Sequence, residues 1–343
     1  MSVKVAVSGI NAVDNPGPGV GIAKGIKESG MDVEIYGLAY DSMEPGIYMR
    51  WLFKRAFMMP YPSVGEDVFI ERLLYIKAHH GLDVLVPALD AELPLVIKAA
   101  DRLKEAGIHT FLPTYEQFKL RAKDRLPEVA ERIGVKVPKT FVVSSYEGLV
   151  KATNELGFPV MIKGIFYKAK KAFNAAEATT HFNAIVSEWG YPVIVQEVIS
   201  GEEMNVVGLG DGEGGHFGLV AIKKLWITSL GKIWTGVTVR NENLLNATER
   251  FVRELRWRGG FEFECIVKDD EIYLIEINPR FPAWVYFSAG VGVNLPARLM
   301  KAALGMEAER DWDYEAGKLY IRYTDDFVAD MEVFQNVVVK GEV

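Results

Sequence analysis

The sequence predicts a multidomain protein of mixed α/β and α+β class: an open parallel sheet covered by helices, then two α+β lobes. Three observations support this. The chain of 343 residues is too long for one ordinary core. Short apolar strands alternate with helical segments over residues 4–106. Beyond residue 200, longer strands joined by glycine-containing turns replace that alternation. We expect domains at 1–116, 117–199 and 200–343.

The N-terminal segment carries the alternation expected of a parallel sheet. Strands are expected at 4–9, 33–38 and 84–87, and helices at 22–29, 68–80 and 95–106. Parallel neighbours need a crossover connection, which is usually a helix, so this order predicts an open parallel sheet.

The remainder of the chain mixes both element types. Helices are expected at 118–133 (with Pro127 near a start or break), 145–156, 177–189, 244–257 and 295–304, and strands at 137–143, 159–164, 193–198, 203–209, 216–224, 232–239, 318–323 and 333–339.

Composition narrows the functional classes. Nearly half of the residues are hydrophobic, which indicates a folded globular protein. The net charge of −7 argues against a nucleic-acid partner. The apolar runs are too short for a membrane span, and the N-terminus lacks a signal segment. The single cysteine, Cys265, excludes an internal disulfide framework and favours a cytoplasmic location.

Residues 261–280, FEFECIVKDDEIYLIEINPR, form the most informative segment. Two alternating arms flank a polar turn, which predicts a β-hairpin. A hairpin folding about Asp270 puts Glu264 directly across from Glu276, and like charges at such a pair are destabilising. A cation between the two carboxylates relieves that repulsion. The alternative is an exposed strand face whose acidic residues point to water.

Asn278 lies two residues beyond Glu276 on the same face of the expected strand. Carboxylate and amide oxygens are hard ligands, so this set favours Mg²⁺ or Mn²⁺ over Zn²⁺.

Further residues suit a nucleotide. Lys163 ends an apolar strand before a glycine, where a lysine can anchor phosphate. The loop 166–174 is basic and is either a flap over the phosphates or a solvated loop. Gln196-Glu197 lie where a strand breaks, and Glu203 follows the next glycine turn. Taken alone, each of these features also suits an ordinary strand end or surface acid.

In this order, Lys163, QEVISGEE at 196–203 and ECIVKDDEIYLIEINPR at 264–280 resemble the ATP-grasp superfamily, and most closely its carbamoyl-phosphate-synthetase-like carboxylate–amine ligases. The resemblance implies a pre-ATP-grasp domain at 1–116, an ATP-grasp small lobe at 117–199 and a large lobe with the metal site at 200–343.

The resemblance also assigns roles to single residues. Phosphate contacts fall to Lys123 and Lys163, adenine recognition to the hinge Gln196, Glu197, Val198 and Ile199, the ribose to Glu203, the metal to Glu264, Glu276 and Asn278, and the developing acyl phosphate to Arg280. Lys163 and Arg280 are the implied catalytic residues, and ATP with Mg²⁺ (or Mn²⁺) the implied cofactors.

The implied reaction joins a small-molecule carboxylate to an amine, with an amino acid or peptide among the candidate substrates, and releases ADP and phosphate. The family also suggests a homodimer. The segment Phe281-Pro282-Ala283-Trp284 departs from the carbamoyl-phosphate enzymes, which argues against bicarbonate and for a bulkier or more apolar acid.

Two other readings stay open: a kinase-like phosphoryl transferase, which would leave a stable phosphorylated product, and a non-catalytic nucleotide-binding protein. A dehydrogenase is disfavoured, because the spacing of Gly17, Gly19 and Gly21 does not match a dinucleotide-binding loop.

Several polar residues have no assigned role from the sequence. Asp90 and Glu92 suit either an amine substrate or a helix cap, with the cap favoured. Lys223, Lys224 and Lys232 suit either an anionic ligand or a basic strand edge.

Overall fold

The computed structural model describes residues 2–13, 15–165, 168–228 and 231–343, and its chain divides into two compact units. The first unit holds residues Met1–Arg121, Met204–Phe263 and Ile277–Val343, and the second holds Ala122–Glu203 and Glu264–Glu276. The three-domain division stays a prediction. Within the described ranges, no helix has the length and apolar character needed to cross a bilayer.

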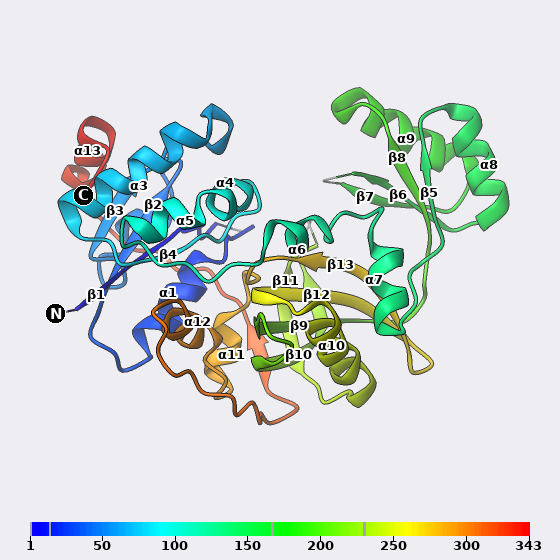
Figure 1. Cartoon of the computed structure of the whole chain (residues 1–343). Helices are drawn as coiled ribbons and strands as arrows, with labels where there is room; N and C mark the ends of the chain where they lie inside the picture. The colour runs from blue at the N-terminus through cyan, green and yellow to red at the C-terminus, as the bar shows by residue number, and fades with distance from the viewer. Residues whose placement is uncertain (1, 14, 166–167, 229–230) are drawn as a thin grey trace. The chain divides into compact units, whose positions relative to one another are not determined.

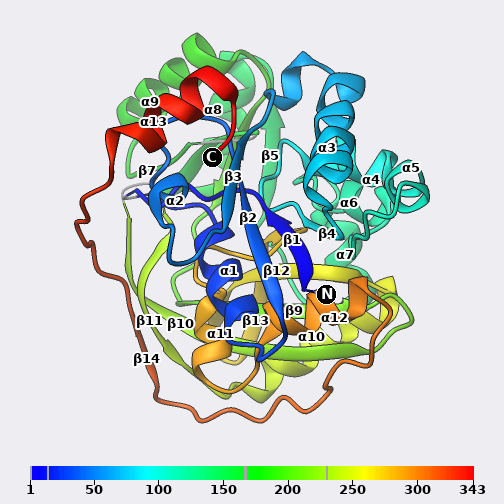
Figure 2. The same ribbon diagram turned by 90° about the vertical axis from the view of Figure 1, so that its left-hand side faces the viewer.

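The first unit contains the parallel sheet that the sequence predicts (Figures 1 and 2). Its strands are β1 (Val3–Val7), β2 (Val33–Ala39), β3 (Arg55–Met58) and β4 (Val84–Val86), in the order β3-β2-β1-β4 with every pair parallel. Strand β3 was not expected. The carboxyl ends of these strands meet at one edge of the sheet, where open α/β sheets bind their ligands.

A glycine-containing loop connects β1 to helix α1 (Gly19–Lys27). The helix begins three residues earlier than predicted. A Cβ atom on Gly19 would lie 2.2 Å from the carbonyl oxygen of Ser8, so only glycine permits this close approach of loop and strand.

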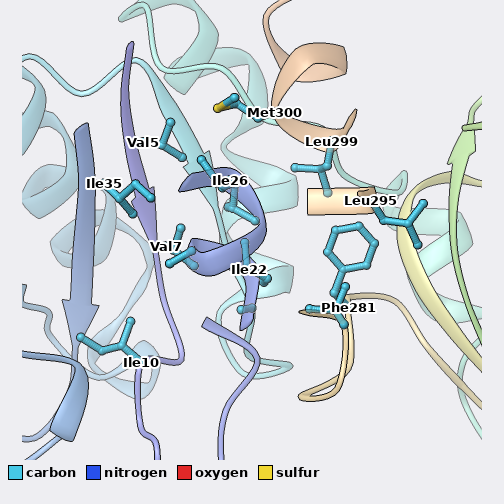
Figure 3. Close-up of a cluster of buried hydrophobic side chains, with 14 of the residues drawn as sticks. Val5, Val7, Ile10, Ile22, Ile26, Ile35, Phe281, Leu295, Leu299 and Met300 are labelled. Carbon is cyan, nitrogen blue, oxygen red and sulfur yellow. The ribbon is translucent and has the colours of Figure 1, made fainter. Parts of the chain in front are cut away.

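Helix α1 fills the space between the parallel sheet and helix α12 (Figure 3). Ile22 and Ile26 lie one turn apart and face Val5 and Val7 of β1 as well as Leu299 of α12. The core therefore joins segments from opposite ends of the chain, and Phe281, next to Arg280, is part of it.

The rest of the first unit is built on a six-stranded sheet with the order β13-β12-β9-β10-β11-β14. The strands are β9 (Glu202–Asp211), β10 (His216–Ile227), β11 (Ile233–Thr238), β12 (Arg258–Lys268), β13 (Glu271–Asn278) and β14 (Leu319–Ile321). Strands β9, β12 and β13 also carry residues of the second unit.

The helices of the first unit connect and cover these sheets. They are α2 (Pro45–Tyr48), the 3₁₀ turn η1 (Pro62–Val64), α3 (Glu66–His80), α4 (Leu93–Lys98), α5 (Ala100–Glu105), α6 (Tyr115–Lys119), α10 (Glu242–Leu255), α11 (Tyr286–Gly290), α12 (Leu295–Ala303) and α13 (Met331–Lys340).

The second unit has a four-stranded sheet with two helices on one face (Figure 1). Its strands are β5 (Thr140–Val143), β6 (Val160–Gly164), β7 (Ala169–Ala172) and β8 (Val193–Glu197), in the order β5-β8-β6-β7, and its helices are α7 (Leu126–Ile133), α8 (Tyr146–Leu156) and α9 (Ala175–Trp189).

Residues Val160, Ile162, Val193 and Val195 face α8 and α9 in one hydrophobic core. Side chains alternate along a strand, so the residues between them face the other side of the sheet.

One strand prediction is wrong. Residues 333–339 form part of helix α13, although valine favours strands. Val333 and Val337 lie one turn apart and pack inward, whereas Val338 and Val339 are exposed, which is a helical pattern of burial. The expected helical stretch 118–133 comprises two helices, α6 and α7, and Pro127 lies in the first turn of α7, near a helix start as predicted.

Candidate functional site

The second unit places Lys163 on the open face of its sheet, opposite the helices. Lys163 lies near the end of β6, and its register partner on β8 is Ile194. Its ammonium group donates a hydrogen bond to Gln196 Oε1 at 2.6 Å. Gln196 in turn donates from Nε2 to Thr140 Oγ1 at 2.9 Å. Three neighbouring strands thus hold the lysine in place.

Charges gather around this lysine. Burial and the nearby ammonium of Lys123 lower the pKa of Lys163 to about 8, and the carboxylates of Glu276, Glu264 and Glu203 oppose that shift. Burial also lowers the pKa of Lys123, and Glu276 opposes that shift too.

The second unit therefore brings together six of the predicted site residues: Lys123, Lys163, Gln196, Glu203, Glu264 and Glu276. Two partly buried lysines beside three carboxylates form a site suited to a polyphosphate with its divalent cation.

The hairpin β12–β13 turns at Asp269 and Asp270, whose φ angles are both positive (49° and 64°). The centre of the turn thus falls between these two residues, not at Asp270 as expected. Regular pairing from this turn would set Glu264 opposite Ile275. Further along, Asn278 hydrogen-bonds Glu262, which fits pairing shifted by one residue.

Along β13, buried and half-buried residues alternate from Ile272 to Ile275, and this alternation breaks at Glu276. Ile275 and Glu276 are consecutive and both half-buried, between buried Leu274 and Ile277. One extra residue in β13 at Ile275–Glu276, a β-bulge, accounts both for regular pairing next to the turn and for the contact between Asn278 and Glu262.

The hinge residues lie at and beyond the end of β8. Glu197 ends the strand, its backbone N–H donates to the Lys139 carbonyl oxygen at 2.8 Å, and its carboxylate accepts from the Lys139 N–H at 3.1 Å. Val198 is half-buried and Ile199 is buried. The side-chain amide oxygen of Gln196 accepts a hydrogen bond from Lys163. Adenine recognition by this hinge stays a prediction.

The loop 166–174 is only partly described, because Phe166 and Tyr167 lie outside the described residues. Its later part is strand β7, which pairs antiparallel with β6. Lys168 forms an ion pair with Glu188, and Lys170 and Lys171 are exposed. Whether the loop closes over phosphate stays a prediction.

The first unit holds the other predicted site residues, Asn278 and Arg280. Arg280 Nη2 lies 3.2 Å from Asp90 Oδ2 and 3.4 Å from Asn278 Oδ1. Glu262 Oε2 accepts a hydrogen bond from Asn278 Nδ2 at 3.0 Å and lies 3.9 Å from Arg280 Nη1. Sequence reasoning gave Glu262 no role, although the alternation of β12 already put it on the same face as Glu264.

Two further cationic side chains, Lys232 and Arg322, lie within electrostatic reach of Arg280 or of each other in the first unit. Burial, together with the charges of Arg280 and Arg322, lowers the pKa of Lys232 to about 8. Lys232 donates to the Pro16 carbonyl oxygen at 2.8 Å, and Arg322 donates to the Ala283 carbonyl oxygen at 2.9 Å. Both of these acceptors are neutral carbonyl oxygens, whereas Arg280 is paired with Asp90. A group of three cationic side chains suits an anionic ligand. Arg322 was not identified from the sequence, because only the pairing of β11 with β14 brings it near Lys232.

Neither Asp90 nor Glu92 caps a helix through its side chain, contrary to the favoured reading. Asp90 pairs with Arg280. The buried carboxylate of Glu92 accepts hydrogen bonds from Tyr40 OH at 2.5 Å, from the N–H groups of Ala88 and Leu89 at 2.9 Å, and from the Ser8 hydroxyl. Glu92 thus ties together the ends of β1, β2 and β4.

The aromatic residues after Arg280 belong to the core. Phe281 and Trp284 are each 2% exposed, and the Trp284 indole donates to Glu262 Oε1 at 2.7 Å. Their size therefore gives no support to a bulky acid substrate.

Among the described residues, no group of three or more His, Cys, Asp or Glu side chains is arranged to hold a metal on its own. The predicted set includes only two carboxylates beside one amide, and its assignment as metal ligands stays a prediction.

Comparison with known proteins shows which family part of this chain matches. Residues 126–283 match the model of the ATP-grasp domain. The large chains of carbamoyl phosphate synthase from Thermotoga neapolitana and Pseudothermotoga lettingae are each 24% identical to the chain, over 265 and 277 residues, which cover 70% and 75% of it. The chain spans only 23% and 25% of those relatives.

Solved structures share the fold. The biotin carboxylase domain of 2-oxoglutarate carboxylase from Hydrogenobacter thermophilus, solved with MgADP, ADP and bicarbonate, matches with a TM-score of 0.69 at 19% identity, covering 93% of this chain and 73% of that one. N5-carboxyaminoimidazole ribonucleotide synthetase in its ADP complex matches with a TM-score of 0.66 at 15% identity, covering 90% of this chain and 79% of that one.

The fold and the family match define residues 126–283 as an ATP-grasp domain that follows a parallel α/β segment. The chain therefore contains an ATP-grasp domain, and the proteins to which it is similar include the large chains of carbamoyl phosphate synthase. The predicted family and fold class are confirmed.

Proposed function

We propose that this protein is an ATP-dependent ligase that joins a small carboxylic acid to an amine through an acyl phosphate. The single observation that supports this most strongly is the site of the second unit, where Lys123 and Lys163 lie within electrostatic reach of Glu276. Opposite charges held together in this way suit a nucleotide polyphosphate and its counter-cation.

The residues present fit ATP and Mg²⁺. Burial depresses the pKa values of both lysines, so each ammonium group gains when an anion binds beside it. In the proposal, Lys123 and Lys163 bind phosphate oxygens, Glu203 binds the ribose, and Glu264, Glu276 and Asn278 hold Mg²⁺. Bound Mg²⁺ would neutralise charge on the phosphates.

Arg280, Lys232 and Arg322 of the first unit would bind the acid substrate. Each of these cations already lies near another, and a substrate carboxylate offsets that repulsion. The carboxylate attacks the γ-phosphorus of ATP, and ADP leaves. The amine nitrogen then attacks the acyl carbon, phosphate leaves with the carbon–oxygen bond electrons, and the nitrogen loses a proton.

The test is a screen for phosphate release. The purified protein is incubated with MgATP and pairs of small acids and amines, including amino acids and short peptides, and the products are weighed by mass spectrometry. The proposal expects phosphate and amide product in equal amounts for at least one pair. A phosphorylated product without phosphate release would instead identify a kinase-like enzyme, and ATP binding without turnover of any pair would contradict the ligase proposal.

A further inference from the structure

Glu262 is a buried carboxylate for which the reaction above has no role. It lies on β12, two residues before the proposed metal ligand Glu264, and is 5% exposed. A carboxylate in such a position is costly unless hydrogen bonds surround it. All of the contacts used below lie within the first unit.

The two oxygens of Glu262 serve different neighbours. Oε1 accepts from Asn205 Nδ2 and from Trp284 Nε1, both at 2.7 Å. Oε2 accepts from Asn278 Nδ2 at 3.0 Å and lies 3.9 Å from Arg280 Nη1.

An ionised carboxylate can only accept hydrogen bonds, so it fixes which end of a neighbouring amide faces it. The Nδ2 end of Asn278 must point to Glu262, and the Oδ1 end therefore points the other way. Arg280, which can only donate, lies 3.4 Å from that oxygen and supports the same orientation. An asparagine binds Mg²⁺ through its oxygen, so the amide orientation decides whether Asn278 can serve as a ligand.

We propose that Glu262 is a positioning residue that turns the amide of Asn278 so that its oxygen, not its nitrogen, is presented for metal binding. This inference rests on the proposed function, because it takes Asn278 as a metal ligand. Groups that orient metal ligands commonly change metal affinity about 10- to 100-fold when they are replaced.

The isosteric variant Glu262→Gln reverses the orientation. The new amide has one acceptor oxygen and one donor NH₂ group. The indole N–H of Trp284 can only donate, so the oxygen of the glutamine must stay at the Oε1 position and its NH₂ must face Asn278. Asn278 then accepts through Oδ1, and its NH₂ group is left on the metal side.

The double variant Glu262→Gln/Asn278→Asp separates this role from a merely structural one. An aspartate at position 278 accepts from the glutamine NH₂ with one oxygen and keeps the other for metal. The single variant Asn278→Asp instead sets two carboxylates against each other, at a contact that is 3.0 Å in the parent.

The experiment measures Mn²⁺ binding in the presence of ADP, by electron paramagnetic resonance of free Mn²⁺, for the parent and the three variants. Circular dichroism shows which variants are folded. We expect the Mn²⁺ Kd to rise about tenfold or more in Glu262→Gln and in Asn278→Asp. The double variant should recover most of the Mn²⁺ affinity that the single variants lose.

The inference would be overturned if folded Glu262→Gln binds Mn²⁺ as tightly as the parent. It would also be overturned if the double variant binds Mn²⁺ no more tightly than the single variant that has the lower affinity. If Glu262→Gln does not fold, the comparison of Asn278→Asp with the double variant tests the same pairing. A parent that binds no Mn²⁺ with ADP would instead contradict the proposed function, so the two failures are distinguishable.

Discussion

The ammonium group of Lys163 lies 2.6 Å from the amide oxygen of Gln196, on the neighbouring strand β8. The two side chains share the face of the sheet that is not covered by helices. Gln196 is itself held by Thr140 on β5, so the position of the lysine is set by side chains from three strands. A lysine held before ligand arrives loses less conformational entropy on binding phosphate.

Replacing Lys163 with methionine should remove most of the phosphate interaction. Charge-assisted hydrogen bonds contribute about 1.5–3 kcal/mol, so we expect the Kd for ADP to rise about 10- to 100-fold. Isothermal calorimetry measures this directly. Lys151→Met, an exposed lysine on α8 of the same unit, is the matched control and should bind ADP like the parent. Equal affinities of the two variants would rule out a phosphate role for Lys163.

The affinity for ADP should depend on pH. The pKa of Lys163 is about 8 because burial and Lys123 disfavour its charged form. ADP binds the protonated amine better, so affinity should be level below pH 8 and fall as pH rises above it, by up to tenfold per unit. An arginine stays charged over this pH range, so the affinity of Lys163→Arg for ADP should fall less steeply as pH rises. Titrations in metal-free buffer from pH 7 to 9.5 test this; a parent Kd that is constant over the range would contradict it.

Two glutamates of one hairpin should differ in their effect on metal binding. Glu264 acts electrostatically on Lys163, whereas Glu271 at the far end of the hairpin pairs with Lys136 at 2.5 Å and is exposed. Glu264→Gln should weaken Mn²⁺ binding in the presence of ADP at least tenfold, because it removes a charged ligand. Glu271→Gln should leave it unchanged. Equal Mn²⁺ affinity of the two variants would contradict a metal-binding role for Glu264.

Glu92 should matter for stability. Its carboxylate accepts from Ser8, Tyr40, Ala88 and Leu89, and removing the carboxylate would leave these buried donors without this acceptor. Unsatisfied buried donors cost about 1–3 kcal/mol each. Glu92→Ala should therefore lower the urea midpoint of unfolding, whereas Glu105→Ala at the exposed end of α5 should not. An unchanged midpoint in Glu92→Ala would mean that these contacts add nothing to stability.

Elements that depend on local pattern were predictable from the sequence. The alternation of apolar residues located β1, β2 and β4, and the polar turn between two alternating arms located the hairpin of Glu264 and Glu276. The glycine-rich loop was recognised, but the start of α1 was placed too late, because the close approach of Gly19 to Ser8 is a tertiary contact.

Features that arise from tertiary contacts could not be predicted. The valines of α13 favour a strand by propensity, and only the packing of Val333 and Val337 makes the segment helical. Arg322 is 90 residues from Lys232 in sequence and joins its cation group through strand pairing. Glu262 was visible in the alternation of β12, but its contacts with Asn205 and Trp284 could not be predicted, because nothing in the sequence links those residues to it.

The most direct test of the central claim compares ADP binding with Mg²⁺ and with EDTA, by calorimetry, in the parent and in Glu276→Gln. A site in which Lys163 binds phosphate and Glu276 binds the cation predicts tighter ADP binding by the parent with Mg²⁺ than without it. Glu276→Gln should bind ADP no more tightly with Mg²⁺ than without it. Its affinity for ADP without metal should stay within a few-fold of the parent's. A parent that does not bind ADP, or a Glu276→Gln variant that keeps the full gain from Mg²⁺, would contradict the claim.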